Sequence, residues 1–319
     1  MPQGSILGPL LFIIYINDLP DMIKCFINLF ADDTMIAVSG KNKLEIETQG
    51  NTIMAEITEW FNHNKLTLNP TKTRIINFNS KQEINIKIND TIIQTVKSNH
   101  TNSQESSFKF LGFLLDEKAN FNSHINKTIS KLNTCNHILR NIKKEIPTKE
   151  KILCYNALGK PFIEYGISIW APNNNKALNT ISTIQKRIIR NIHGSSRRIH
   201  TEPLFKKYKI LKFKDLITYN NLLIGHFVFY EYAPAAILNL IKKEVPHERL
   251  RRNIWNLKIN GANKSSITKF IIPKDWNELN IELKQIKNRK KFKRAILKHF
   301  IDKYKLFINC SDHNCNICY

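Results

Sequence analysis

The chain has 319 residues, of which 42% are hydrophobic and 10% aromatic, enough apolar material for one large domain or two ordinary ones. Its 49 Lys and Arg residues outnumber its 26 Asp and Glu residues, so the formal charge is +23. This composition excludes an acidic disordered chain and predicts a polyanionic partner.

The excess of positive over negative charge is confined to the second part of the sequence. Residues 1–119 hold 11 basic and 13 acidic residues, a balance of −2, whereas residues 120–319 hold 38 and 13, a balance of +25. We therefore predict a division near residue 120, with a carboxylate-bearing front and a basic back that can hold a phosphate backbone. The alternative is a solvated, lysine-rich surface that reflects a general bias toward Asn, Ile and Lys, but such a bias should not spare the front.

No membrane-spanning segment or secretory signal is expected. The longest apolar run, residues 6–16, is interrupted by Gly8 and Pro9 and is shorter than the roughly 20 residues that a spanning helix needs. We expect an intracellular protein of the nucleus or cytoplasm that is not secreted and has no membrane partner. Three scattered cysteines are typical of reduced core residues rather than of a disulfide framework: Cys25, Cys135 and Cys154.

Short elements of both kinds follow one another in the front. The apolar stretch 10–15 predicts a helix that ends before Pro20. Two β-prone runs, 27–30 and 35–38, enclose the segment 31–34, which predicts a hairpin with acidic residues at its tip. Hydrophobic spacing further predicts an amphipathic helix over 44–61 and strands over 74–78, 84–88, 91–96 and 108–115. The front is therefore α+β.

The hydrophobic period becomes helical after residue 120. One apolar stripe runs from Ile125 to Ile142 and another from Leu178 to Ile192, so the back is predicted to be mainly helical. The opposite face of the second helix is basic and continues into a basic loop, which makes both a candidate phosphate contact. An exposed basic face without a partner is an equally open alternative. The candidate backbone contacts are Lys186, Arg187, Arg190, Arg197 and Arg198.

Four short motifs stand in a fixed order in the front. They are PQGSILGPLLF at 2–12 with YINDLP at 15–20, FADD at 30–33, NKLTLNP at 64–70 with Lys72, and FKFLG at 108–112. An Asp-Asp pair by itself is usually a solvated surface turn. In this order, however, the four segments resemble motifs B, C, D and E of the reverse transcriptases of non-LTR, jockey-type retrotransposons.

The resemblance implies a domain organisation. Residues 1–119 would form a partial right-hand polymerase palm, an α+β arrangement of a strand hairpin plus helices. Residues 120–215 would form a helical, thumb-like region, and residues 216–319 a basic carboxyl-terminal region of unknown role. The likeness is strong for residues 1–116, fair to about residue 215 and thin afterwards.

The same resemblance implies roles for single residues. Asp32 is expected to be a ligand of Mg²⁺, with Asp33 beside it in a lesser role, because Mg²⁺ takes one or two protein carboxylates and completes its shell with water and phosphates. Lys72 would neutralise or protonate the leaving pyrophosphate, although a surface lysine is an even alternative. Nucleotide and template contacts are expected from Gln3, Gly4, Ser5, Phe30 and Ala31. The primer grip would be Phe108, Lys109, Phe110, Leu111 and Gly112, where the two phenylalanines could equally be strand core.

The implied activity is RNA-directed DNA polymerisation, which uses an RNA template, a DNA primer, deoxynucleoside triphosphates and two metal ions. The family takes its other essential aspartate from motif A, which precedes motif B, and Met1 stands inside motif B. We therefore expect a fragment of the polymerase that is inactive alone. The alternative is a non-catalytic, nucleic-acid-binding remnant of a retroelement.

Four possible soft ligands lie close to the end of the sequence: Cys310, His313, Cys315 and Cys318. Zn²⁺ accepts this set of sulfur and nitrogen atoms. The spacing is tight for one tetrahedral site, so a reduced tail without zinc is the expected state.

Overall fold

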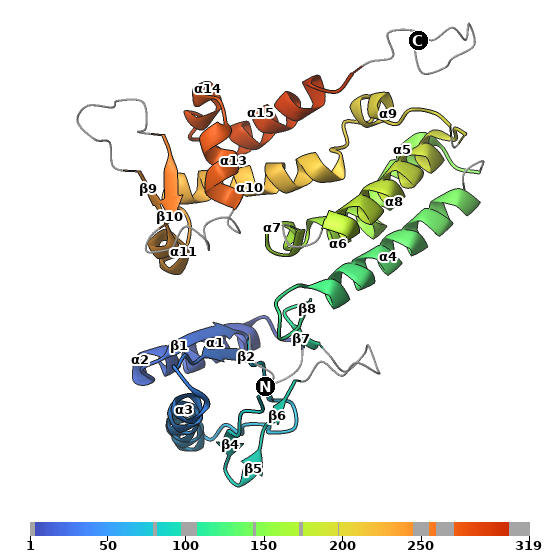
Figure 1. Ribbon diagram of the computed structural model, residues 1–319. Coiled ribbons are helices and arrows are strands. Elements are labelled where there is room, and N and C mark those ends of the chain that lie inside the picture. The colour runs from blue at the N-terminus through green and yellow to red at the C-terminus, as the bar shows by residue number, and fades with distance from the viewer. Residues whose placement is uncertain are drawn as a thin grey trace, which may run out of the picture. The chain divides into compact units, whose positions relative to one another are not determined.

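The computed structural model describes residues 4–78, 82–96, 107–142, 145–171, 175–196, 198–244, 255–259 and 271–305. The chain divides into two compact units, Met1–Ala119 and Asn120–Tyr319. The first unit combines helices with short strands, and helices dominate the second (Figure 1). The fold is thus mixed α and β, as predicted. Among the described residues, none of the helices combines the length and apolar character needed to cross a membrane.

The first unit begins with a helix, a short helical turn, a hairpin and a long helix: α1 (Leu7–Ile16), α2 (Leu19–Met22), β1 (Phe26–Phe30), β2 (Asp33–Ala37) and α3 (Lys43–His63). Small two-stranded ladders follow: β3 (Arg74–Ile75) with β6 (Gln94–Thr95), β4 (Lys87–Ile88) with β5 (Thr91–Ile92), and β7 (Phe108–Phe110) with β8 (Phe113–Leu115). The β3–β6 pair is parallel and the other two are antiparallel.

One apolar core holds the first unit together. Leu19 is completely buried and Ile57 of α3 is 1% exposed, and Ile27 and Leu29 of β1 pack against the same cluster. The start of α3 follows from its sequence, because the Asn42 side chain accepts a hydrogen bond from the Glu45 N–H at 2.9 Å and so caps the helix. The predicted hairpin and long helix are therefore confirmed.

The strand predictions need correction. Only Arg74–Ile75 of the predicted strand 74–78 forms a strand, and the predicted strand 91–96 divides into β5 and β6, which pair with different partners. Ile84, Ile86 and Ile88 alternate inward and are all buried, but only the last of them belongs to a strand ladder. The alternation of isoleucines in this segment reflects burial in the core more than membership of a strand ladder. The predicted single strand 108–115 is wrong, because Leu111 and Gly112 both have positive φ, 45° and 85°, and fold it into the β7–β8 hairpin. Two such residues in succession are the signature of a tight hairpin turn.

The second unit consists mainly of helices. They are α4 (Asn122–Asn141), α5 (Thr148–Leu158), α6 (Lys160–Glu164), α7 (Ile167–Trp170), α8 (Asn175–His193), α9 (Glu202–Lys207), α10 (Phe213–Phe229), α11 (Ala235–Leu240), α13 (Ile271–Glu278), α14 (Ile281–Lys284) and α15 (Arg289–Asp302). A small antiparallel ladder joins β9 (Ile241–Lys243) and β10 (Leu257–Ile259).

The two predicted helical stripes are confirmed and pack against each other. Leu132 and Leu139 of α4 and Ile188 of α8 are completely buried, and α4 and α8 lie side by side (Figure 1). The boundary expected near residue 215 falls inside α10, which packs on α8 as well as on α13 and α15. The close approach of α10 to α13 requires Gly225, since a Cβ there would lie 2.9 Å from the Trp276 ring.

A buried amide links three parts of the second unit. The Gln185 side chain of α8 is 1% exposed. Its Nε2 donates to the Tyr155 hydroxyl of α5 at 3.1 Å and to the Leu211 carbonyl at 3.0 Å, while its Oε1 accepts the Phe213 N–H at 2.8 Å. Burial also raises the pKa of the Tyr155 hydroxyl. The amide therefore fixes where α10 begins relative to α5 and α8.

We predict that Gln185→Leu lowers the free energy of unfolding by about 2–4 kcal/mol, because it leaves a buried N–H and a buried carbonyl unpaired. Urea unfolding followed by circular dichroism measures this. The matched control is Lys186→Leu on the neighbouring exposed position, which should change stability by only about 0.5 kcal/mol. Equal losses of unfolding free energy for both variants would show that the hydrogen bonds of Gln185 add no more stability than an exposed side chain does.

Candidate functional site

The acidic hairpin predicted from the sequence is present in the first unit. Phe30 of β1 pairs with Asp33 of β2, so Ala31 and Asp32 form the two-residue turn. Ala31 has a φ of 52°, in the left-handed region that favours glycine. Sharp turns of this kind suit right-handed strand twist, and here the turn places Asp32 at the extreme tip.

Burial differs between the two faces of the hairpin. Ile27, Leu29 and Ile36 pack against the core of the first unit. Phe30 and Asp33, which are directly opposite each other, share the other face and are exposed. Asp32 is exposed as well. The inner face thus anchors the hairpin while the tip presents both carboxylates to solvent.

These carboxylates suit a hard cation. Mg²⁺ prefers oxygen ligands and commonly takes one or two from protein, the rest coming from water and phosphates. Over the described residues, no group of three or more His, Cys, Asp and Glu side chains lies close enough together to hold a metal ion. Asp32 and Asp33 therefore fit part of a magnesium site, to which other ligands would have to be added.

The other predicted front residues occupy separate places. Gly4 has a positive φ of 89°, and the Ser5 hydroxyl accepts the Gly8 N–H at 3.3 Å at the start of α1. Lys72 is exposed in a turn that Asn69 organises by accepting the Thr71 N–H at 3.0 Å. Gln3 lies outside the described residues. The glycine conformation agrees with a tight turn, while Lys72 has the surroundings of an ordinary surface lysine.

The five predicted primer-grip residues form the β7 side and the turn of a hairpin. Phe108 pairs with Leu115, and Phe110 pairs with Phe113. Both phenylalanines are half-buried, whereas Lys109 and Gly112 are exposed. Lys109 and the turn at Gly112 are therefore accessible to a partner, whereas the rings of Phe108 and Phe110 are partly covered by the rest of the chain.

The basic side chains on α8 and in the loop after it differ in their exposure and in their hydrogen bonds to the rest of the chain. Lys186 and Arg187 are exposed. The Nε of Arg190 donates to the Ile199 carbonyl at 3.0 Å, and its pKa is lowered by burial and by the charge of Arg187. Arg198 is exposed, and Arg197 lies outside the described residues. Lys186, Arg187 and Arg198 are thus available to phosphates, whereas Arg190 also holds the loop that follows the helix.

A polar surface pocket of about 400 Å³ adjoins Arg187. It lies between α4 and α8, and its other lining residues are Ile129, Asn133, Asn179, Thr180, Thr183 and Ile184. No sequence pattern marks Asn133 or Asn179, because single polar residues on a helix look like ordinary surface. Burial and the charges of Lys207 and Lys151 lower the pKa of nearby His193, as expected in a positive environment.

The possible zinc ligands Cys310, His313, Cys315 and Cys318 lie outside the described residues. The zinc-free tail remains a prediction.

Comparison with known proteins agrees with the motifs. Residues 1–115 match the family described as reverse transcriptase (RNA-dependent DNA polymerase). The chain is 24% identical over 225 residues to a probable RNA-directed DNA polymerase from transposon X-element and 23% identical over 230 residues to the RNA-directed DNA polymerase from mobile element jockey, both of Drosophila melanogaster. These alignments cover 68% and 67% of this chain and 24% of each relative.

A further relative is shorter. The chain is 26% identical over 180 residues to a retrovirus-related Pol polyprotein from type-1 retrotransposable element R1 of Nasonia vitripennis, covering 53% of this chain and 52% of the relative. The chain spans about a quarter of the length of the first two relatives. No solved structure matches it significantly.

The turn at the tip yields a prediction. Ala31→Gly should stabilise the β1–β2 hairpin by about 1 kcal/mol, because glycine tolerates positive φ, and Ala31→Val should destabilise it. Hydrogen exchange of the amides of residues 26–37 measures the change. As a control, Ala37→Val places a β-branched residue at an ordinary strand position and should not reduce protection. Greater protection in Ala31→Val would contradict the turn geometry.

Proposed function

We propose that the chain forms the palm and thumb part of a reverse transcriptase of the jockey type, because residues 1–115 match the reverse transcriptase family and the chain is similar to the RNA-directed DNA polymerases of X-element and jockey. The observation that carries the proposal is the anchored hairpin with Asp32 and Asp33 exposed at its tip, within the matched residues. Its partners would be an RNA template, a DNA primer and deoxynucleoside triphosphates.

Each part of the first unit would have a defined task. Asp32, with Asp33 beside it, would hold Mg²⁺, which when bound activates the primer hydroxyl and stabilises the charge on the leaving oxygen. The β7–β8 hairpin would position the primer strand through Lys109 and the turn at Gly112. Lys72 would neutralise the leaving pyrophosphate or supply a proton to it.

Exposed apolar surface supports the idea that another segment of the polymerase completes this unit. Leu7, Leu10 and Ile14 of α1 are 63%, 53% and 63% exposed, and Phe30 is 63% exposed beside Asp33. A helix that is apolar on all sides is normally buried, and a two-stranded sheet is marginal by itself. We propose that a segment carrying a further carboxylate packs here, so that it and Asp32 share the metal ions.

The second unit would act as the thumb and hold the primer–template duplex. Its part of the sequence carries the whole positive excess, and Lys186, Arg187 and Arg198 are exposed on and after α8. Phosphate contacts of this kind position a duplex without reading its sequence. The rival proposal, a non-catalytic nucleic-acid-binding remnant, rests on this same surface and on the incomplete ligand set at Asp32.

We predict that the 319-residue chain alone extends a primer at about 10⁻³ or less of the rate of a chimera in which the preceding part of a jockey polymerase, including motif A, is fused to it. The reason is that the chimera adds the carboxylate of motif A to those of Asp32 and Asp33 as metal ligands. In the chimera, Asp32→Ala should abolish extension more completely than Asp33→Ala. A primer-extension assay with Mg²⁺, free of host polymerases, measures the rates of all four proteins.

The control for this assay is Asp21→Ala, which removes an exposed acid of α2 and should leave extension unchanged. Extension by the chain alone that vanishes in Asp32→Ala would show that the chain itself supplies the missing carboxylate. Asp18 and Asp116 would then be the first candidates. An inactive chimera that still binds nucleic acid would favour the non-catalytic remnant.

We also predict a steep salt dependence of nucleic-acid binding. If about six phosphates are neutralised, log K should fall against log salt with a slope of roughly −4 to −5. Replacing Lys186 and Arg187 together by Gln should reduce the steepness of the slope by about 1.4–1.8, since each phosphate contact contributes about 0.7–0.9. The matched control replaces the exposed Lys24 and Lys41 of the first unit by Gln. An equal change of slope in the control would contradict the assignment to α8.

A further inference from the structure

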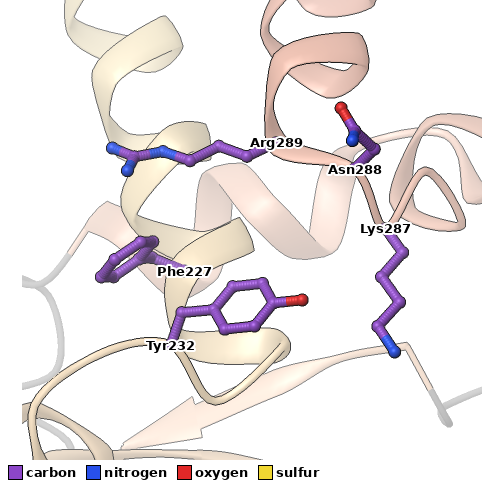
Figure 2. A pocket seen from close by; sticks show the side chains of 5 residues that line it. All are labelled: Phe227, Tyr232, Lys287, Asn288 and Arg289. Atoms are coloured by element: carbon purple, nitrogen blue, oxygen red, sulfur yellow. The ribbon is translucent and has the colours of Figure 1, made fainter.

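The second unit has a surface pocket of about 650 Å³ where the end of α10 meets the segment leading into α15. Two aromatic rings, two cations and an amide line it (Figure 2): Phe227, Tyr232, Lys287, Asn288 and Arg289. None of these lining side chains is a carboxylate. The volume falls in the range of ordinary small-ligand pockets.

The end of α10 fixes the two rings. Glu231 has a positive φ of 60°, and the Tyr232 N–H donates to the Phe227 carbonyl at 2.8 Å. This is a Schellman ending, which often brings the side chains of these two positions together. The ring centroids are 6.0 Å apart. Helix capping explains that contact, but it leaves Tyr232 48% exposed, which is a large aromatic surface in solvent.

Contacts from α10 also fix the segment that carries the cations. The Tyr230 hydroxyl donates to the Lys284 carbonyl at 2.8 Å, and His226 Nε2 lies 3.0 Å from the Ile286 carbonyl. The Asn288 side chain accepts the Lys291 N–H at 3.0 Å and so caps α15. Lys287 and Arg289 therefore start from a fixed backbone beside the rings, which reduces the ordering cost of binding.

The charge around the pocket is strongly positive. The Arg289 guanidinium lies over the Phe227 ring, 4.7 Å from its centroid, as a cation–π contact. Glu231, the acid that precedes Tyr232, is paired with Lys243 at 2.6 Å. Six exposed basic residues extend from the pocket along α15: Lys287, Arg289, Lys290, Lys291, Lys293 and Arg294. A ligand that is both flat and anionic complements these features.

We propose that this pocket binds an unpaired nucleotide of a single-stranded nucleic acid. The base stacks on the exposed face of Tyr232, and Lys287 and Arg289 contact the flanking phosphates. In a duplex, neighbouring bases cover both faces of each base, so the pocket selects a single strand. The site consists of other residues than the hairpin of Asp32 and the basic face of α8, and it does not require the chain to be a polymerase.

The test is fluorescence anisotropy of the full chain with labelled oligouridine and oligothymidine of about 12 nucleotides. A hairpin duplex is the comparison ligand, and a salt concentration of about 0.3 M weakens diffuse phosphate contacts. Tyr232→Leu keeps an apolar side chain for the helix ending but removes the π face. We expect it to weaken single-strand binding about tenfold and leave duplex binding within about twofold, while Tyr232→Phe binds as the unaltered chain does.

Matched charge variants separate the pocket from general attraction. Arg289→Gln and Lys290→Gln each remove one positive charge at neighbouring exposed positions, but only Arg289 lines the pocket. The proposal expects a larger loss of single-strand affinity for Arg289→Gln. As a further control, Tyr165→Leu alters a ring that is 50% exposed elsewhere in the unit and should have no effect.

Photocrosslinking provides a measurement that needs no variant. Oligonucleotides carrying 5-iodouracil, irradiated with the unaltered chain, should give a crosslinked peptide containing Phe227 or Tyr232. Crosslinks only at other sites would overturn the proposal, as would equal losses for Arg289→Gln and Lys290→Gln together with no loss for Tyr232→Leu. In the anisotropy test, weaker binding of both oligouridine and oligothymidine by Tyr232→Leu supports recognition through the base and the phosphates. If Tyr232→Leu weakens the binding of oligouridine alone, an added contact to the 2′-hydroxyl is supported.

Discussion

The second unit depends on the buried amide of Gln185, since no other side chain described in this unit bonds at once to α5 and to both ends of the short segment that enters α10. A buried amide is costly unless its donors and acceptor are paired, so its satisfied state selects one arrangement of these helices. The start of α10 at Phe213 is thereby set. Because a helix is a rigid rod of about 1.5 Å per residue, the end of α10 at Phe229 is set as well.

Two functional surfaces of this unit follow from that constraint. Gln185 precedes the exposed pair Lys186 and Arg187 on the same helix, so the residue that holds the core also orients the basic face. The far end of α10 carries Phe227 and, after the helix ending, Tyr232. One helix therefore connects the core that supports the exposed basic face of α8, the proposed phosphate contact, to the aromatic pocket.

The two units expose different kinds of surface, with different physical consequences. The first exposes apolar side chains on α1 and beside Asp33, which favours association with further protein. The second exposes Lys and Arg in large excess, which favours association with a polyanion and weakens as salt rises. The tip of the β1–β2 hairpin in the first unit and the end of α10 in the second both carry candidate functional groups at an element end, where the side chains are open to a ligand.

The sequence by itself determined the features that depend on local patterns. The charge division near residue 120, the acidic hairpin around Asp32 and the stripes of α4 and α8 follow from composition, turn chemistry and a period of 2 or 3.6, and each of these acts over a few residues. The order of the four motifs was sufficient to indicate a reverse transcriptase. The β7–β8 hairpin was missed although Gly112 is a local signal, because the apolar run on both sides of it resembles one continuous strand.

Tertiary structure decided what depends on residues distant in the sequence. Gln185 stands in a helix beside a run of basic residues and looks like surface, yet its partners Tyr155 and Phe213 come from other elements and bury it. The alternating isoleucines of 84–88 are buried because the core covers them. Only Lys87 and Ile88 belong to a strand, although the Ile86 carbonyl also accepts the Ile93 N–H at 2.8 Å. The pocket unites Phe227 and Tyr232 with Lys287 and Arg289, and no periodicity links segments so far apart. Only the packing of α10 against α13 and α15 brings them together, since spatial proximity comes from long-range burial and not from local propensity.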